Sequence, residues 1–223
     1  MKIFKFPSEI TPKLAEETGW HIGDGSMNFY KNSKHTSGLY QLRGHIEDDR
    51  EHYISRIAPI FKKLYGIDIN LREMPSTRVF GFQIWNNNLV KFKQGLGLKT
   101  GPKLDIIIPK QFLVNNELKV AVLRGIFDTD GCVYLEKKNH KFYPRMEIMT
   151  ISLKLAKQIR QSFNDLNLRT TFYKDASSYL GNRRDAYKIT IRGNEMFNRF
   201  IDIIKPANPK HVAKYKFYQK SFK

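Results

Sequence analysis

The chain has 223 residues, of which 41% are hydrophobic, and it carries 39 Lys and Arg against 21 Asp and Glu, a net charge of +18. The composition excludes a disordered chain, and no apolar run reaches the roughly 20 residues that a membrane span needs. The single cysteine, Cys132, cannot form an internal disulfide, so we expect an intracellular, non-secreted protein of a prokaryotic cytoplasm or an organelle. Because both halves are basic and rich in core residues, the charge favours a folded surface that binds a polyanion over a generic basic protein.

The first half predicts seven elements in chain order. A helix, two strands, a longer helix, two strands and a short helix are expected over 11–25, 26–31, 38–45, 48–65, 67–74, 78–85 and 88–95. Thr11 suits the N-cap of the first helix and Pro12 its first turn. In the longer helix, apolar residues from Tyr53 to Leu64 recur at helical spacing.

The same order of elements then restarts. Residues 97–110, rich in Gly and Pro, are expected to connect a first unit (1–96) to a second (111–223). The second unit predicts helices over 116–130, 152–166 and 195–204, strands over 133–138, 143–150, 169–174 and 186–192, and a final helix over 209–218. A long polar loop is expected between its last two strands. The sequence therefore predicts an α+β protein of two pseudo-symmetric αββαββα units.

Two segments align without gaps at a constant offset of 106 residues: ETGWHIGDG (17–25) and LRGIFDTDG (123–131). Gly19 matches Gly125, and Gly23 matches Thr129, so each predicted helix has small residues four positions apart on one face. Glycine inside a helix costs roughly 1 kcal/mol relative to alanine, which calls for a packing reason. We expect these two helices to pack against each other about a pseudo-two-fold axis.

An aspartate ends each of these helices, Asp24 in the first copy and Asp130 in the second. The C-terminal end of a helix carries partial negative charge, and two carboxylates brought together by symmetry also repel each other. Bound divalent cations would relieve both problems, and hard oxygen ligands suit Mg²⁺. The alternative is that each Asp-Gly is only a turn after a helix; the paired copies in a basic chain favour the metal site.

These segments resemble the LAGLIDADG motif, and the repeated unit resembles the half-unit of that family of homing endonucleases, over essentially the whole chain. The second copy is a close match. The first departs from it with Glu17 at the usually apolar first position and Ile22 where the second copy has Asp128. Neither is the position of the family's essential acid, which is carried over to Asp24 and Asp130.

The resemblance implies a monomeric, single-chain enzyme with two saddle-shaped antiparallel sheets. Such an enzyme binds a long asymmetric double-stranded DNA site and cuts both strands across the minor groove, leaving 3′ overhangs. It uses Mg²⁺, or Mn²⁺ as a substitute, while Ca²⁺ is expected to bind without supporting cleavage. The chain is too short to carry splicing machinery as well, so a free-standing, intron-encoded enzyme is expected.

The resemblance also implies residues around the acids. Gly23 and Thr129 are expected to complete the metal sites, and Lys103 and Lys210, after the last helix of each unit, to stabilise phosphate charge or polarise water. Solvated lysines are the alternative for both. Glu47 and Thr150 stand at the strand-to-helix junctions where the family often has a water-positioning Gln.

The strands are expected to read DNA, because alternate side chains share one face of a sheet and a sheet can enter the major groove. Any one candidate could equally be a plain surface residue. They are Tyr30, Gln41, Arg43, Arg72, Arg78 and Gln83 in the first unit, and Lys137, Arg145, Glu147, Arg183, Arg184, Lys188 and Arg192 in the second.

Two other functions stay open on sequence grounds. A DNA-binding protein of the same fold without cleavage usually lacks one or both acids, whereas both are present here. An RNA maturase that assists intron splicing would need the same basic charge, so intron RNA is a second possible partner. His21, inside the first motif, and Cys132 are expected to be packing or surface residues without a metal role.

Overall fold

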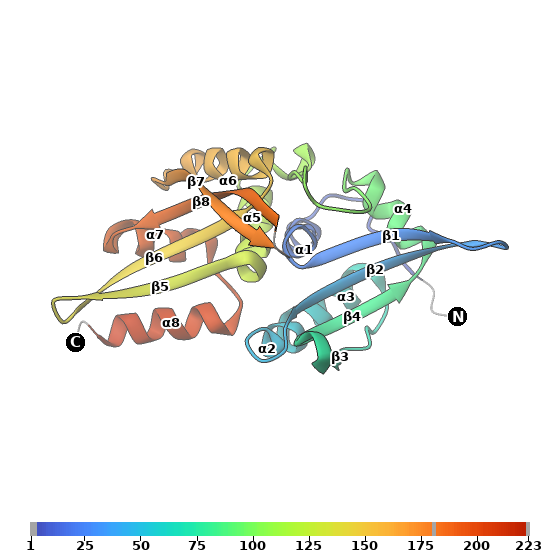
Figure 1. Ribbon diagram of the computed structural model, residues 1–223, viewed down its shortest axis with the longest axis horizontal. Helices are drawn as coiled ribbons and strands as arrows, with labels where there is room; N and C mark the ends of the chain where they lie inside the picture. The colour runs from blue at the N-terminus through green and yellow to red at the C-terminus, as the bar shows by residue number, and fades with distance from the viewer. Residues whose placement is uncertain (1–3, 180–181, 222–223) are drawn as a thin grey trace.

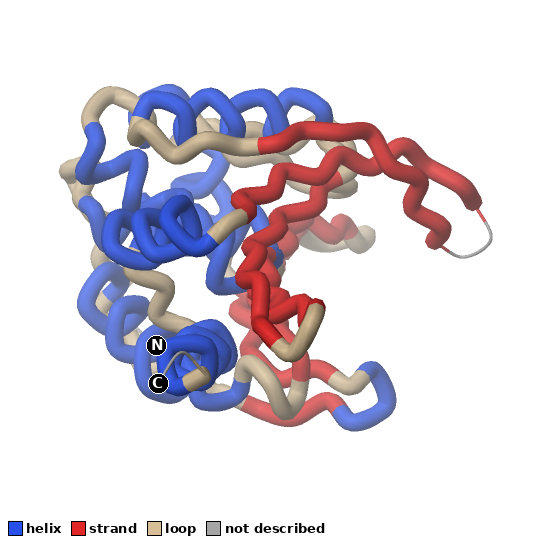
Figure 2. Tube along the Cα trace, turned by 90° about the vertical axis from the view of Figure 1, so that its left-hand side faces the viewer, coloured by secondary structure: helices blue, strands red, loops and turns tan. Residues whose placement is uncertain are grey.

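The structure is a computed structural model that describes residues 4–179 and 182–221, without the side chains of 177–184. Two four-stranded antiparallel sheets, ordered β1-β2-β4-β3 and β5-β6-β8-β7, lie on either side of the helices α1 and α5 (Figure 1). The other helices cover one face of the sheets and leave the opposite, curved face open (Figure 2). The predicted α+β architecture of two similar units is confirmed.

The first unit comprises α1 (Pro12–Gly23), β1 (Gly25–Lys31), β2 (Thr36–His45), α2 (Arg50–His52), a π-helical turn (Tyr53–Ile57), α3 (Ala58–Tyr65), β3 (Arg72–Met74), β4 (Val79–Trp85) and α4 (Asn87–Gly95). The second comprises α5 (Asn116–Asp130), β5 (Gly131–Lys138), β6 (Lys141–Thr150), α6 (Leu153–Asp165), β7 (Thr171–Tyr179), β8 (Asn182–Arg192) and α7 (Asn194–Ile204), followed by α8 (Pro209–Lys220). The first unit has no equivalent of α8 among its described residues.

Two sequence predictions about strands were wrong. The strand expected over 67–74 is confined to β3, because Ile67 is buried and Ile69 and Leu71 pack against the core from an irregular segment. The long polar loop expected in the second unit is instead a hairpin, since backbone pairing continues from Thr171↔Thr190 to Tyr179↔Asn182. Residues 174–185 (KDASSYLGNRRD) show no alternation of apolar and polar residues, so this part of the sequence carries no strand signal.

The helices α1 and α5 pack with their backbones almost in contact. A Cβ added to Gly19 would lie 2.8 Å from Gly125 Cα, and one added to Gly125 would lie 2.9 Å from Gly19 Cα. One added to Gly23 would lie 2.7 Å from Thr129 Cβ. The small residues at matching positions are therefore what lets the two motif helices meet, as their spacing predicted.

One continuous hydrophobic core runs through both units, and its first half contains a buried ion pair. Glu17 pairs with Lys93, both side chains being 0% exposed. The hydroxyls of Tyr40 and Tyr65 donate to the same carboxylate at 3.0 and 3.2 Å. The carboxylate of Glu17 is therefore not left unpaired in the core, because Lys93 and two tyrosine hydroxyls are its partners. This allows a charged residue at the usually apolar first position of the motif.

Among the described residues, none of the helices combines the length and apolar character that crossing a bilayer requires.

A test of the helix contact is Gly19→Ala. Its methyl group has no space beside Gly125, so we expect a loss of about 1–3 kcal/mol in the free energy of unfolding, measured by urea denaturation. The matched control is Gly95→Ala in α4, where an added Cβ meets nothing within 4 Å. That substitution should stabilise the protein by about 0.5–1 kcal/mol. Equal effects of the two substitutions would contradict the close helix contact.

Candidate active site and nucleic-acid interface

The two motif aspartates lie side by side where α1 and α5 end. Asp24 caps α1, its backbone N–H donating to Trp20 O at 2.9 Å, and Asp130 is the last residue of α5. The carboxyl carbon of Asp130 lies 3.3 Å from where a Cβ on Gly23 would be, so Asp130 borders the first motif. The side chain of Asp24 is half-buried and that of Asp130 is exposed. A ligand can therefore reach both.

Both carboxyl groups are poorly suited to carrying negative charge without a partner. Desolvation by the surrounding protein, and then the charges of Asp130 and Asp49, raise the pKa of Asp24 well above its usual value. Desolvation raises the pKa of Asp130 as well, against the lowering effect of Lys103 and Lys210. Two neighbouring carboxylates in this environment gain from a bound cation.

The donor set fits a cation that retains water and phosphate ligands. Within the described part of the chain, no three His, Cys, Asp or Glu side chains converge to hold a metal ion. A cation here would therefore have the carboxylates of Asp24 and Asp130 as its side-chain ligands. One or two carboxylates completed by water and phosphate oxygens is the coordination typical of Mg²⁺.

Lys103 lies beside the acids, but its ammonium group is engaged by main-chain carbonyls. Its Nζ donates to Ile22 O at 2.9 Å and to Gly23 O. These are carbonyls at the C-terminal end of α1, where positive charge is favoured. Burial lowers the pKa of Lys103, while Asp130 and Asp24 act to raise it. The carbonyl of Gly23, expected to serve a metal, thus has a lysine partner in this structure.

Lys210 belongs to the second unit but pairs with an acid of the first. Its Nζ lies 2.7 Å from Asp49 Oδ1, and Asn208 Nδ2 donates to the same oxygen at 2.7 Å. Asn208 Nδ2 also donates to Asp128 O at 2.8 Å. Lys103 and Lys210 are thus both near the acids, but they are held by different partners.

The strand-to-helix junction carries its acid at a different residue from the one predicted. Glu47 is exposed, and its backbone N–H donates to His45 Nδ1 at 3.4 Å. The structure brings Asp49, two residues later, toward the aspartates, where its charge raises the pKa of Asp24. Thr150 accepts a backbone bond from Ser152, and Thr129 Oγ1 donates to Gly125 O at 3.0 Å. Asp49 and Asn208 are the residues that sequence reasoning missed.

The open face of the first sheet carries polar and aromatic side chains in rows across the strands. Gln41 pairs in register with Ser26 and Gln83, and Arg43 with Gly81, which pairs with Arg72. Arg43 Nη2 donates to Gln83 Oε1 at 3.1 Å. Of the first-unit candidates, Tyr30, Gln41, Arg43, Arg72 and Gln83 therefore share this face. Arg78 does not, because it lies in the turn between β3 and β4 with a φ of 53°.

An exposed aromatic pair at the outer end of this face was not predicted. Trp85 is 55% exposed and Tyr30 51% exposed, and their ring centroids lie 5.7 Å apart. Both positions alternate with buried residues along their strands, which is the only sequence signal that could have added Trp85 to the candidates. The two rings are tilted by 59° relative to each other, and exposed aromatic groups of this kind offer an apolar surface to bases.

The open face of the second sheet is lined with ion pairs. Arg145 Nη2 lies 2.6 Å from Glu136 Oε2, and Lys188 Nζ lies 3.4 Å from Glu147 Oε1 and 3.0 Å from Asp175 Oδ2. Arg192 pairs in register with Arg145 on this face. Lys137, by contrast, alternates with the open-face positions of β5 and follows the buried face. The side chains of Arg183 and Arg184 lie outside the described residues.

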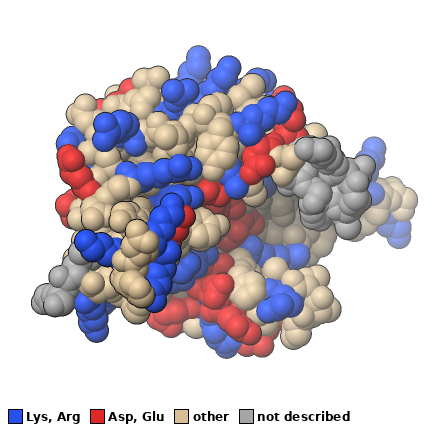
Figure 3. Space-filling model, turned by 60° about the vertical axis from the view of Figure 1, so that its left-hand side comes forward, with Lys and Arg blue, Asp and Glu red and all other residues tan. Residues whose placement is uncertain are grey.

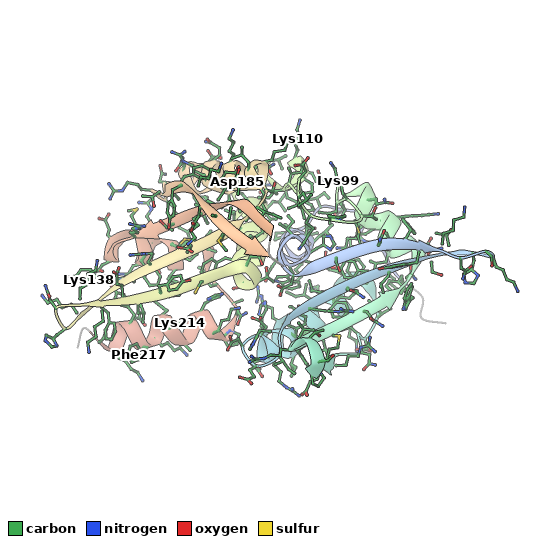
Figure 4. The ribbon with its side chains drawn as sticks, viewed as in Figure 1. Lys99, Lys110, Lys138, Asp185, Lys214 and Phe217 are labelled. Atoms are coloured by element: carbon green, nitrogen blue, oxygen red, sulfur yellow. The ribbon has the colours of Figure 1, made fainter. Side chains whose placement is uncertain are left out.

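Figure 3 shows Lys and Arg side chains gathered around a hollow in which acidic side chains lie. Lys138 stands at the outer end of β5, and Lys214 lies on α8 (Figure 4). Lys214 Nζ donates to Val133 O at 3.0 Å, at the edge of the sheet. A basic surface with acids at its centre is suited to binding a polyanion, since the cations attract phosphates and the acids can hold metal ions.

The fold places two similar units side by side, with the two motif helices packed together. Residues 117–205 match the family model for a LAGLIDADG-like domain. The homing endonuclease I-DmoI is similar in fold, with a TM-score of 0.63, 16% identity, and coverage of 86% of this chain and 95% of that one. The LAGLIDADG meganuclease I-AabMI, bound to uncleaved DNA, gives a TM-score of 0.57 at 14% identity over 95% and 90% of the two chains. The resemblance to the single-chain LAGLIDADG family is therefore confirmed.

A curated relative shares sequence as well. A glutamine–fructose-6-phosphate aminotransferase of Methanocaldococcus jannaschii is 25% identical over 141 residues, which are 60% of this chain and 11% of that protein. The chain thus corresponds to a small part of that relative's length.

Three histidines are buried around the motif helices. His21 stacks on Tyr40 at 5.4 Å, His52 lies edge-on to Trp20 at 5.9 Å, and His211 packs on Phe127 at 4.6 Å. Burial lowers the pKa of His52 and of His211 to about 3. His21 is thus a packing residue, and its pKa is also lowered by burial.

These histidines predict a loss of stability in acid. Between pH 6.5 and 3 these histidines bind protons in the unfolded chain but not in the folded protein, so their contribution to stability falls as pH decreases through this window. From pH 7 to 5, His52 and His211 should each lower the free energy of unfolding by about 2 kcal/mol. His211→Phe should remove that share of the decrease in urea denaturation at the two pH values. The exposed His35, changed to Gln, should leave it intact; identical pH dependence in all three proteins would refute the assignment.

Proposed function

We propose that this protein is a monomeric, site-specific endonuclease of double-stranded DNA. The observation that carries the proposal is the pair Asp24 and Asp130, accessible to a ligand at the junction of two open, largely cationic sheets. Other DNA-binding folds need no paired carboxylates at the centre of a basic surface. Acids there weaken phosphate binding unless metal ions occupy the site, so their presence supports chemistry on phosphate.

The relatives supply a mode of binding. I-DmoI has been solved in complex with DNA and Mn, and with DNA and Ca. By analogy, the open faces of both sheets of this protein would lie along a DNA duplex, with Arg43, Gln83 and the Tyr30–Trp85 pair in one half and Arg145, Lys188 and Arg192 in the other. Because the two halves carry different side chains, the site they recognise would be long and asymmetric.

The site supports hydrolysis of both strands across the minor groove, leaving 3′ overhangs. Asp24 and Asp130 would hold Mg²⁺, or Mn²⁺ in its place, and Ca²⁺ without turnover. Bound there, such an ion lowers the pKa of water and stabilises charge on the scissile phosphate. Lys103 and Lys210 bring positive charge next to the acids, where negative charge develops on phosphate oxygens. Since the two acids adjoin each other, the two phosphates that are cut must also be close, as they are across a minor groove.

The test is to challenge a plasmid library of intronless gene junctions with the protein, with and without Mg²⁺, and to sequence the ends. Cleavage at one defined junction only with Mg²⁺ would support the proposal, and the gene that carries it would show whether the enzyme serves intron homing. Tight binding of one junction without cleavage would favour a silent DNA-binding protein. Stimulated intron splicing without DNA cleavage would favour an RNA maturase.

Substitution of either acid is expected to reduce cleavage without weakening DNA binding. Asp24→Asn and Asp130→Asn should each reduce double-strand cleavage by at least about 100-fold, because the oxygens that hold the cation are lost. DNA affinity in Ca²⁺-free buffer should be equal to or higher than that of the wild type, since each substitution removes a negative charge near phosphates. Full cleavage by either variant would contradict the metal-site assignment.

The role of the open face in DNA binding can be tested with two substitutions that each remove one positive charge. Arg192→Gln, on the open face of β8, should weaken DNA binding and lower the slope of log affinity against log salt by about 1. Lys157→Gln removes the same charge from an exposed position of α6, among the helices that cover the opposite face. It should leave the salt slope unchanged in fluorescence-anisotropy titrations; equal slopes for the two variants would exclude the open face as the DNA surface.

A further inference from the structure

The two lysines beside the acids are held in chemically different ways. Lys103, from the connector that follows the first unit, donates to the carbonyls of Ile22 and Gly23 of that unit. Lys210, from the second unit, donates to the carboxylate of Asp49, which belongs to the first. The pseudo-symmetry of the backbone is therefore not followed by the contacts around the two acids.

The side chain of Asp49 forms hydrogen bonds with Lys210 and Asn208 instead of capping its own helix. It stands at the N-terminus of α2 without making a side-chain cap, and it is 4% exposed. Oδ2 accepts the backbone N–H of His45 at 2.8 Å, while Oδ1 accepts from Lys210 and Asn208. A carboxylate fixed by a backbone donor on one side and two side-chain donors on the other defines a single place for the ammonium group.

Asn208 joins this network to the second motif. Its Nδ2 donates both to Asp49 Oδ1 and to Asp128 O, two residues before Asp130. Its Oδ1 accepts the backbone N–H of Lys210 at 3.1 Å, which fixes the start of α8. The backbone and the ammonium group of Lys210 are thus both anchored, one to the motif helix α5 and the other to Asp49.

We infer that Asp49 is the positioning residue for Lys210, and that the two halves of the active site are non-equivalent because only one of them depends on this contact between units. The inference rests on the proposed endonuclease function. A long lysine side chain loses much conformational freedom when it is held in one place, and a fixed carboxylate partner provides this before DNA arrives. Loss of Asp49 should therefore impair the same DNA strand as loss of Lys210, and spare the strand that depends on Lys103.

The experiment is strand-resolved cleavage of a duplex with a different label on each strand, using a junction that the wild type cuts. Lys210→Met should slow one strand by about 100-fold, and Asp49→Asn should slow that same strand by about 10-fold or more, so that the same nicked intermediate accumulates. Lys210→Met with Asp49→Asn should be no slower than Lys210→Met alone, because the two residues act as one unit. Lys103→Met should slow the other strand.

Asp48→Asn is the matched control, since Asp48 is 67% exposed and pairs with His45 rather than with a lysine. It removes the same charge one residue away and should change neither strand. Melting temperature and DNA affinity in Ca²⁺ establish that each variant is folded. Trace acetylation of the DNA-free protein gives a readout that needs no cleavage: in Asp49→Asn, labelling of Lys210 relative to Lys214 should increase at least about twofold.

The outcomes separate the two claims. Equal slowing of both strands by Asp49→Asn, slowing of the strand that Lys210→Met spares, or unchanged labelling of Lys210 would overturn the positioning role while leaving the endonuclease function intact. Absence of cleavage by the wild type at every junction would overturn the endonuclease function, and the inference with it.

Discussion

Contact between two helix backbones is the constraint on which the rest of this structure depends. Gly19 and Gly125 leave no space for a side chain between α1 and α5, so the relative position of the two helices is fixed by backbone atoms. Each helix runs directly into the first strand of its sheet, at Gly25 and Gly131. One contact therefore sets both the separation of the terminal acids and the angle at which the sheets meet. Flexible side chains at this interface would leave the geometry of the acids undefined.

The protein has a net charge of +18, and acidic partners hold many of the cationic side chains on its open faces in place. On the second sheet, Glu136, Glu147 and Asp175 pair with Arg145 and Lys188. Such partly exposed pairs contribute little to stability. They do hold long cationic side chains in defined positions, and they oppose non-specific attraction to any polyanion. In the proposed endonuclease, a DNA sequence that offers better partners than these acids would displace them, so the pairs would favour specificity over raw affinity.

Sequence reasoning succeeded where a physical rule links local pattern to geometry. The small residues four apart predicted the helix contact, and that contact implied the meeting of Asp24 with Asp130. Sequence reasoning failed where the partner of a residue lies in a distant segment of the chain and no periodic pattern links the two. Nothing in the residues around Asp49 shows that Lys210 lies 2.7 Å away, 161 positions later in the chain. The same holds for Lys93, whose burial against Glu17 explains the departure of the first motif only once both side chains are placed.

The two copies of the motif differ at their sixth position, which is Ile22 in the first and Asp128 in the second. This difference is the origin of the asymmetry around the acids. In the second unit, Asp128 accepts the backbone N–H groups of Ala207 and Asn208 at 2.9 and 3.1 Å and so fastens the segment after α7 to the motif helix. Burial raises the pKa of Asp128 to about 7, and these two bonds act to lower it. Ile22 has no oxygen to offer in its side chain, and there Lys103 reaches the main-chain carbonyls instead. Two units joined in one chain can diverge in this way, whereas the identical units of a symmetric dimer cannot. Recognition of an asymmetric DNA site requires such divergence.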